Sequence, residues 1–408
     1  MRWLKFTGFL CITAIALSVM AEVAARVIVC HFVDDAVFAA LASVDQFNKY
    51  GAASRSTRIP SPYLGWVMRP NVGDSSRGEG MSTNSRGFRG GEFEVPKPEN
   101  EFRIVCIGGS TTFDSEIEDN AKTYPARLQF YLEKKGYTVK VINAGVPGWT
   151  SYENLINFAF RISDIGPDLI IDYDAWNDLY LRFVRPENYT GDNSRLMGGK
   201  LTSFPWYERL TLVRILQALK TQQKGIMVRG QAEILMARIN ADFLRDFEAG
   251  IPDPVTSKPM TMTEVLKRNP PVYFKRNLVN LIAMAQGESC RTLLLTFAHS
   301  RHPEAFLSSV IIGINPQDKA SRDQLTLGLD EMNTVIKSVG QETNTPVFDL
   351  AGVFPEPDHY SDYYTAGFHN NAAGADVKAS LIADYLVKMD LIPDRYHAAR
   401  GEASTGTR

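Results

Sequence analysis

The sequence predicts an α/β fold built on a parallel sheet. Between Arg103 and Tyr173, short runs of β-branched and apolar residues alternate with stretches of helical length. Strand, helix, strand, helix, strand in this order is typical of α/β domains with parallel strands. The pattern returns after residue 290, where two more strand-like runs precede an amphipathic helix.

Each expected element follows from its local pattern. The strands are expected at 104–107, 139–142, 169–173, 293–297 and 347–350, where apolar runs of strand length occur. Helices are expected around 124–135, closed by Gly136, and near 152–161. A last helix is indicated by one apolar face, which comprises Val377, Leu381, Ile382, Tyr385 and Leu386.

The regions around this core differ in character. Residues 34–100 are rich in Gly, Ser, Pro and Arg and are expected to form lead-in loops and short strands. We assign the main domain to 101–392, with a helical insertion at 180–290 in which leucines and Ile215 recur at helical spacing. Residues 393–408 are expected to be a disordered polar tail.

The N-terminus predicts export. Arg2 and Lys5 precede the uncharged stretch 6–21, and apolar residues continue to Val33. A cleaved signal peptide fits the small-residue site Val19-Met20-Ala21, and a buried helix also fits. We favour a membrane anchor with a cytoplasmic N-terminus, because the apolar stretch approaches the length of a span. The domain is then extracytoplasmic, in the periplasm or at the cell surface.

Composition excludes some functions and favours none. The net charge is −2 and 22% of the residues are charged, so nucleic acid is not expected as a partner. The four cysteines have no spacing that suggests zinc or a disulfide framework. His299 and His302 have the spacing of a metal pair but no evident third ligand. No cofactor and no metal are expected.

Candidate catalytic residues follow the expected strands, where ligands bind in open α/β sheets. Ser110 comes directly after the first strand and two glycines, which let the backbone turn sharply. Gly148 follows the second strand and is able to offer a backbone N–H. Asn177 follows the third strand, and its amide is suited to an oxyanion. Each of these patterns alone also fits an ordinary turn or helix cap.

His369 opens the junction into the last helix. A histidine there is placed to reach a serine at the sheet edge and act as a general base. Taken together, Ser110, Gly148, Asn177 and His369 resemble the four conserved blocks of the SGNH/GDSL hydrolase family, of the exported and N-terminally anchored bacterial type. The resemblance spans roughly 103–178 and 343–388 and includes the spacing of Asn371 and Gly374 after His369.

The resemblance implies a three-layer α/β/α sandwich of flavodoxin-like type and a serine esterase, acyl hydrolase or acyltransferase. Ser110 is then the nucleophile and His369 the general base. The backbone N–H groups of Ser110 and Gly148 and the side chain of Asn177 form the oxyanion hole. The substrate is an acyl ester, with a cell-surface polysaccharide or lipid as its expected source.

Three positions depart from the family pattern. Gly109 stands where the family has aspartate, and Ala175 where it has glycine. Ala366 stands three residues before His369, where the family has the aspartate that orients the histidine. Asp362 is the nearest upstream acid and the candidate replacement, and a Ser–His dyad is the alternative. The rival function is a catalytically inactive relative that binds carbohydrate or assists assembly.

Overall fold

The computed structural model describes residues 2–33, 41, 43, 46, 57–61, 63–73, 80–192, 206–222, 251–302, 319–365 and 367–398. The chain divides into two compact units. The first comprises Met1–Trp66 and Leu196–Asp242, and the second comprises Val67–Arg195 and Phe243–Arg408. Each unit is considered by itself below.

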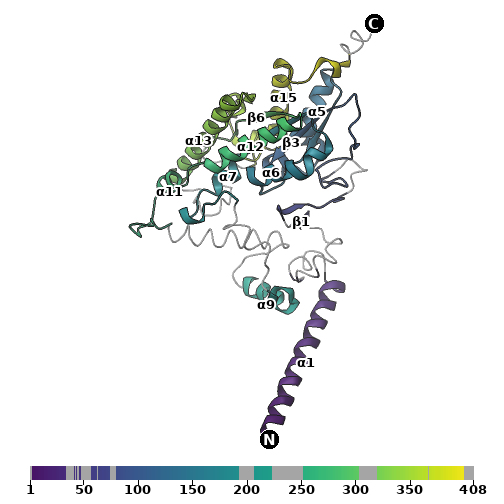
Figure 1. Cartoon of the computed structure of the whole chain (residues 1–408), viewed down its shortest axis with the longest axis vertical. Coiled ribbons are helices and arrows are strands. Elements are labelled where there is room, and N and C mark those ends of the chain that lie inside the picture. Colours follow the sequence, from purple (N-terminus) through teal and green to yellow (C-terminus); the bar gives the residue numbers. More distant parts are fainter. Residues whose placement is uncertain are drawn as a thin grey trace. The chain divides into compact units, whose positions relative to one another are not determined.

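The second unit is built on a parallel sheet of five strands (Figure 1). In spatial order the strands are β4 (Val139–Asn143), β3 (Phe102–Gly108), β5 (Leu169–Tyr173), β6 (Arg291–Leu295) and β7 (Val347–Phe348). All four pairings are parallel. This is the 2-1-3-4-5 order of flavodoxin-like folds, in which the chain reverses direction across the sheet between β3 and β5.

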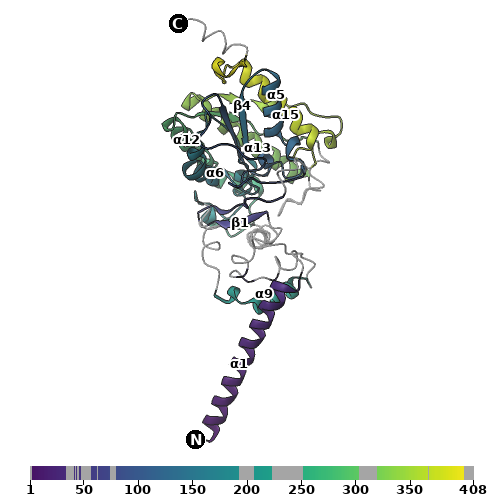
Figure 2. The same ribbon diagram turned by 90° about the vertical axis from the view of Figure 1, so that its right-hand side faces the viewer.

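Helices cover both faces of the sheet. Helices α5 (Tyr124–Lys134) and α15 (Ala372–Lys388) pack together on one face. Helices α6 (Ser151–Asn157), α12 (Val272–Gly287) and α13 (Lys319–Thr343) form the other layer. Figure 2 shows α5 and α15 on one side of β4, with α6 and α12 on the opposite side. The prediction of a three-layer α/β/α sandwich is confirmed.

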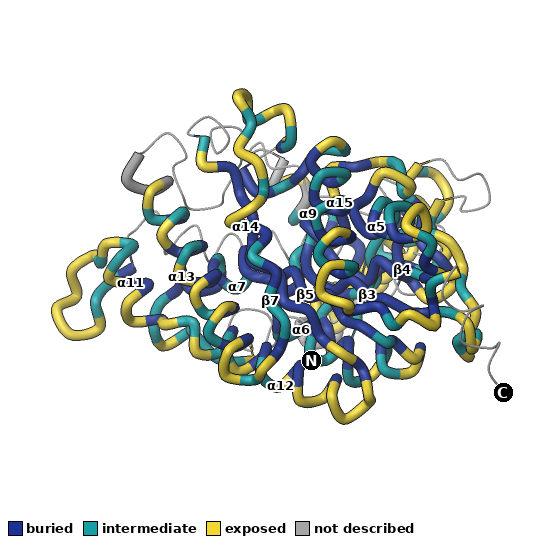
Figure 3. The backbone as a smooth tube through the Cα atoms, turned by 90° about the horizontal axis from the view of Figure 1, so that it is seen from above, coloured by how far each residue is buried: buried dark blue, intermediate teal, exposed yellow. Residues whose placement is uncertain are grey.

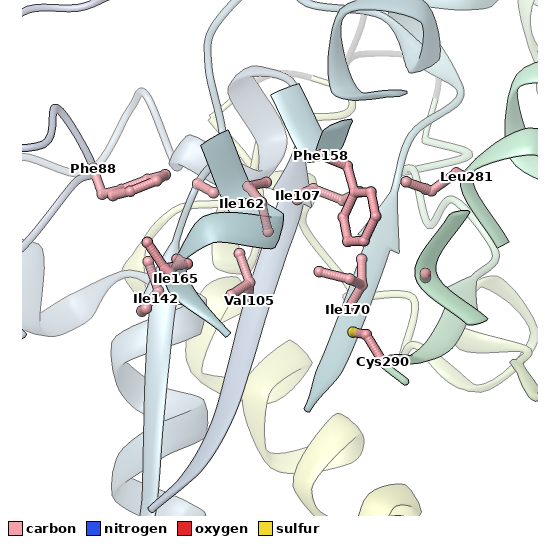
Figure 4. Packing of buried hydrophobic residues seen from close by; sticks show 12 residues of the cluster. Phe88, Val105, Ile107, Ile142, Phe158, Ile162, Ile165, Ile170, Leu281 and Cys290 are labelled. Atoms are coloured by element: carbon pink, nitrogen blue, oxygen red, sulfur yellow. The ribbon is translucent and has the colours of Figure 1, made fainter. Parts of the chain in front are cut away.

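One hydrophobic cluster lies where the sheet meets the α6 and α12 layer. Every residue of β3 and β5 is buried, as the continuous blue strands in Figure 3 show. Burial on both faces explains the apolar runs 104–107 and 169–171 within these strands. Figure 4 shows part of the cluster, in which Val105, Ile107, Ile170, Phe158 and Leu281 pack together.

Local sequence signals set the helix ends. Helix α6 begins at a capping box in which Thr150 and Glu153 bond to each other's backbone N–H groups. Helix α15 begins after Asn371, whose side chain accepts from the N–H of Gly374 at 3.0 Å. Gly136 follows α5 with a positive φ of 87°, a conformation that favours glycine.

Several features differ from the sequence-based expectation. Helix α6 is shorter than expected and continues as a π-helical turn, η3 (Phe158–Ile162). Helix α12 lies within the expected insertion yet supplies core residues such as Leu281. The C-terminal segment is ordered beyond residue 393, because η10 (Asp394–Tyr396) forms a turn and buries Tyr396. Residues 399–408 lie outside the described residues.

The remaining elements are short connections. They are β1 (Arg58–Ser61), β2 (Gly65–Met68), α4 (Ser110–Phe113), η2 (Asn120–Lys122), η4 (Ser163–Ile165), α7 (Trp176–Tyr180), η5 (Pro186–Asn188), α11 (Met262–Arg268), α14 (Leu350–Val353) and η9 (Tyr360–Asp362).

The first unit holds α1 (Arg2–His31), η7 (Trp206–Arg209) and α9 (Thr211–Gln222). Within α1, the stretch Phe6–His31 is long and apolar enough to cross a membrane, and its most apolar 18 residues have a mean hydropathy of 2.0. Only 6% of those 18 residues are buried. Length and composition alone support this span, and a signal sequence has the same properties.

Candidate active site

The site lies at the carboxyl ends of β3, β4 and β5, beside the point where the strand order reverses. Strand β3 ends at Gly108, whose φ of 149° lies outside the range that other residues readily adopt. A Cβ on Gly108 would overlap the side chain of Thr112. The sharp turn at the two glycines therefore starts α4 at Ser110, directly above the strand end.

Ser110 and His369 are in hydrogen-bond contact. The distance from His369 Nε2 to Ser110 Oγ is 2.8 Å. For Nε2 to accept the serine proton, the neutral imidazole carries its hydrogen on Nδ1. The His369 side chain is 17% exposed, so it is largely buried and yet retains some contact with solvent.

Contacts made by the residues around His369 hold its segment in place. The ring of Phe368 stacks on Trp176 with centroids 3.8 Å apart, which joins the histidine segment to the segment that carries Asn177. The backbone N–H of Thr365 donates to the carbonyl of His369 at 2.9 Å. Asn371 also donates to the carbonyls of Ser361 and Asp362, so the loop before His369 is tied to the start of α15.

The candidate oxyanion groups gather around Gly109. The amide Nδ2 of Asn177 donates to the carbonyl of Trp149 at 2.7 Å, and an amide nitrogen has a second hydrogen to offer. A Cβ on Gly109 would lie 2.5 Å from that Nδ2 and 3.2 Å from the Trp149 oxygen. Gly148, which precedes Trp149, has a φ of 86°. In this chain the Asn177 amide packs directly against Gly109, in space that a larger residue would share.

A carboxylate faces the other nitrogen of His369, and it belongs to Glu116. Oε1 of Glu116 lies 3.7 Å from His369 Nδ1. This distance exceeds a hydrogen bond, and the Glu116 side chain is 46% exposed. Asp362, the acid expected from the sequence, accepts instead from the backbone N–H of His359 at 3.3 Å. Ala366 lies outside the described residues.

Arg89 organises the loop that carries Glu116. Its buried guanidinium donates to the carbonyls of Phe113 and Asp114, each at 2.8 Å, and to that of Ile117. It also donates to the side chain of Asn120 at 2.8 Å. Burial lowers the pKa of Arg89 to about 10, so it is still protonated at neutral pH. One side chain thus holds the loop on both sides of Glu116.

A buried cation, Lys378, contacts the turn that carries Ser110. Lys378 of α15 donates to the carbonyl of Thr111 at 3.1 Å, and its Nζ lies 3.8 Å from Oδ1 of Asp114. Burial lowers the pKa of Lys378 and raises that of Asp114, while their mutual attraction opposes both shifts. Asp114 also accepts from the N–H of Tyr124 at 2.6 Å, which couples this pair to the start of α5.

Burial first, and then the charge of Lys378, lower the pKa of His369 to about 4. The imidazole is therefore neutral at neutral pH, which is the form that accepts a proton. A nearby carboxylate stabilises the imidazolium that forms when it does so. The positive charge of an imidazolium is spread over both ring nitrogens, and Glu116 lies beside one of them, Nδ1.

Acidic side chains also cluster behind the site. Asp178, next to Asn177, accepts from the N–H of Ser151 at 2.9 Å and from its hydroxyl at 2.5 Å. Asp174 accepts from the side chain of Asn154 at 2.7 Å. Burial raises the pKa of Asp172, Asp174 and Asp178. These bonds join the end of β5 to α6, so their evident role is to hold the Asn177 turn.

Metal chemistry has no evident site in the part of the chain that the structure describes, where no group of three or more His, Cys, Asp or Glu side chains converges. The residues that the sequence analysis missed are Glu116, Arg89 and Lys378. Glu116 carries no motif, and Arg89 sits in a stretch that reads only as loop. Lys378 falls on the inner side of an amphipathic helix, and an inward lysine is an unusual signal that points to a buried partner.

Comparisons with known proteins add the following findings. No family model matches the chain, and a search of curated proteins found no match. Among solved structures, it is similar to a GDSL-like lipase from Bacteroides thetaiotaomicron, at 13% identity over 70% of this chain and 88% of that one, with a TM-score of 0.35.

It is also similar to a lipase/acylhydrolase from Enterococcus faecalis, at 16% identity over 71% of this chain and 96% of that one, with a TM-score of 0.39. An acetyl xylan esterase is 12% identical over 71% of this chain and 99% of that one, with a TM-score of 0.36. Solved structures similar to this chain thus include GDSL hydrolases, the family that the sequence motifs resemble.

Proposed function

We propose that this chain is a membrane-anchored, extracytoplasmic serine hydrolase of the SGNH/GDSL type that cleaves or transfers an acyl ester. The observation that carries the proposal is the 2.8 Å contact between Ser110 Oγ and His369 Nε2 at the carboxyl end of β3. A serine activated by a neighbouring base is the arrangement that acyl transfer requires.

The reaction runs in two halves. Ser110 Oγ attacks the acyl carbonyl carbon while its proton passes to His369 Nε2. The carbonyl oxygen becomes an oxyanion, which the N–H groups of Ser110 and Gly148 and the side chain of Asn177 stabilise. His369 then returns the proton to the leaving alcohol as the carbon–oxygen bond breaks, which leaves an acyl group on Ser110.

The second half regenerates the enzyme. Water, or an acceptor hydroxyl in the case of transfer, attacks the acyl carbon and gives its proton to His369. The collapse of the second oxyanion releases the acid or the new ester, and the proton returns to Ser110. Glu116 is the acid that orients His369 and stabilises its cation in both halves, in place of the acid missing at Ala366.

The class of substrate follows from the location of the unit. An N-terminal anchor with a cytoplasmic N-terminus leaves the catalytic unit outside the cytoplasm, where acylated polysaccharides and lipids of the cell surface are the esters at hand. We therefore propose an acyl group on one of these as the substrate.

Fluorophosphonate labelling tests the proposal, because the probe reacts with activated serines. The detergent-solubilised full chain is expected to be labelled, and Ser110→Ala and His369→Ala are expected to lose labelling. Ser115→Ala is the matched control, since Ser115 is an exposed serine on the same loop. A folded wild-type chain that is not labelled would favour the rival function, a non-catalytic protein that binds carbohydrate.

A further inference from the structure

The segment that carries α9 exposes large apolar side chains. In η7, Trp206 is 76% exposed and Tyr207 is 41% exposed. In α9, Leu216 is 65% exposed and Leu219 is 54% exposed. The two leucines are three residues apart, so they share one face of the helix. Exposed apolar side chains that gather in this way mark a surface that contacts a partner or a membrane.

The N-terminal part of α9 is tied to α1. Oε1 and Oε2 of Glu22 accept from the N–H groups of Thr211 and Leu212 at 2.8 and 3.0 Å, which caps the start of α9. Arg26 pairs with Glu22 at 2.7 Å and donates to the carbonyl of Arg209 at 2.6 Å. Ile215 packs against the buried Val29 of α1. Within the first unit, therefore, α9 begins on α1 itself.

The point of attachment fixes the depth of α9. The uncharged stretch Phe6–Ala21 rises roughly 24 Å at about 1.5 Å per residue, and a hydrocarbon layer is about 30 Å thick. Charged side chains are costly within that layer, so Glu22 and Arg26 mark its outer edge if α1 spans it. The hydrogen bonds from Glu22 hold the first turn of α9 at that edge.

We propose that η7 and α9 lie in the outer membrane–water interface, with Trp206, Tyr207, Leu216 and Leu219 inserted among the lipids beside the anchor. The inference rests on the proposed anchor. Tryptophan and tyrosine are the residues that membrane proteins place at this level, and helices with one apolar face bind there in the plane of the surface. Because Glu22 and Arg26 hold the start of α9 at the outer end of the proposed anchor, lipid rather than a second protein is the occupant that these side chains meet.

Quenching by brominated lipid tests the proposal. The full chain with Trp3→Phe, reconstituted in phosphatidylcholine vesicles, keeps four tryptophans. Trp66, Trp149 and Trp176 are 1%, 0% and 9% exposed, so Trp206 is the one open to lipid. Phosphatidylcholine brominated near the headgroup end of its acyl chains is expected to quench the part of the tryptophan fluorescence that comes from Trp206. The matched variant Trp3→Phe/Trp206→Phe is expected to lose that quenching.

Two outcomes would overturn the proposal, and they separate it from the anchor. If the protein stays with the vesicles after alkaline carbonate washing but brominated lipid does not quench Trp206, the anchor stands and α9 does not contact lipid. Concentration-dependent cross-linking in that case would assign the face to a second copy. If carbonate removes the protein, the anchor is wrong and the inference falls with it.

Discussion

Glu116 faces His369 from the side opposite the nucleophile, with Oε1 3.7 Å from Nδ1. The two residues come from different ends of the catalytic unit: Glu116 follows the first strand of the sheet, and His369 precedes the last helix. Ser110 and Glu116 lie close together in the sequence, because Ser110 is the first residue of α4 and Glu116 follows that helix. We propose that Glu116 takes the place of the acid that the family pattern has at the position of Ala366.

Glu116→Gln tests this relationship. We expect kcat on a soluble aryl ester to fall about 10-fold with little change in KM, because the carboxylate acts on the imidazolium and not on the substrate. The loss is smaller than for a buried triad acid, since Glu116 is half exposed and beyond hydrogen-bond distance. Asp362→Asn is the control and should leave kcat unchanged. Equal losses in both variants would contradict the assignment.

The pH profile reports the histidine directly. Because burial and Lys378 lower the pKa of His369 to about 4, kcat/KM should rise with pH through about 4 and then level off. Below that pH the ring is protonated and does not accept the serine proton. An acid limb near the ordinary histidine pKa would contradict the buried, neutral imidazole.

Lys378→Met should move that acid limb to higher pH. The lysine cation disfavours the imidazolium, so removing it raises the pKa of His369. The single variant leaves Asp114 buried without its partner and should cost about 3–5 kcal/mol in the free energy of unfolding. Lys378→Met/Asp114→Asn should recover part of this cost while keeping the shifted profile, as measured by urea unfolding and kinetics. If the acid limb of the pH profile is unshifted in both variants, the charge of Lys378 does not influence His369.

Gly109→Ala should impair the oxyanion hole. The added Cβ would lie 2.5 Å from Asn177 Nδ2, so the amide must move. Loss of one oxyanion donor typically lowers kcat about 100-fold. Gly91→Ala is a matched control, because a Cβ at Gly91 meets nothing within 4 Å. Normal kcat in a folded Gly109→Ala enzyme would exclude Asn177 as a donor.

Arg89→Leu should destabilise the catalytic unit by roughly 3 kcal/mol, because several buried carbonyls lose their donor. Urea unfolding measures this change. Arg89→Lys keeps the charge but lacks the planar set of donors, so its stability should lie between those of Leu and wild type. If kcat in the lysine variant is unchanged, Arg89 supports only the fold and does not position Glu116.

Much of the fold and half of the site could be predicted from local patterns. The strand at 104–107 was recognisable because burial on both faces favours an unbroken apolar run, and the strand at 139–142 because Val139, Val141 and Ile142 are β-branched and buried. Helix α13 was missed although its pattern was present, since Leu325, Leu329, Met332, Ile336 and Val339 recur at helical spacing and are all buried.

By itself the sequence determined which residues stand at the strand ends, because strand, turn and helix are set by neighbours along the chain. Ser110, Gly148 and Asn177 could be named for that reason. Only the tertiary structure decided which acid faces His369 and that the Asn177 amide packs against Gly109. Those contacts depend on loops whose course is fixed by distant partners, such as the carbonyls that Arg89 gathers around Glu116. No local sequence pattern predicts contacts between residues this far apart in the chain.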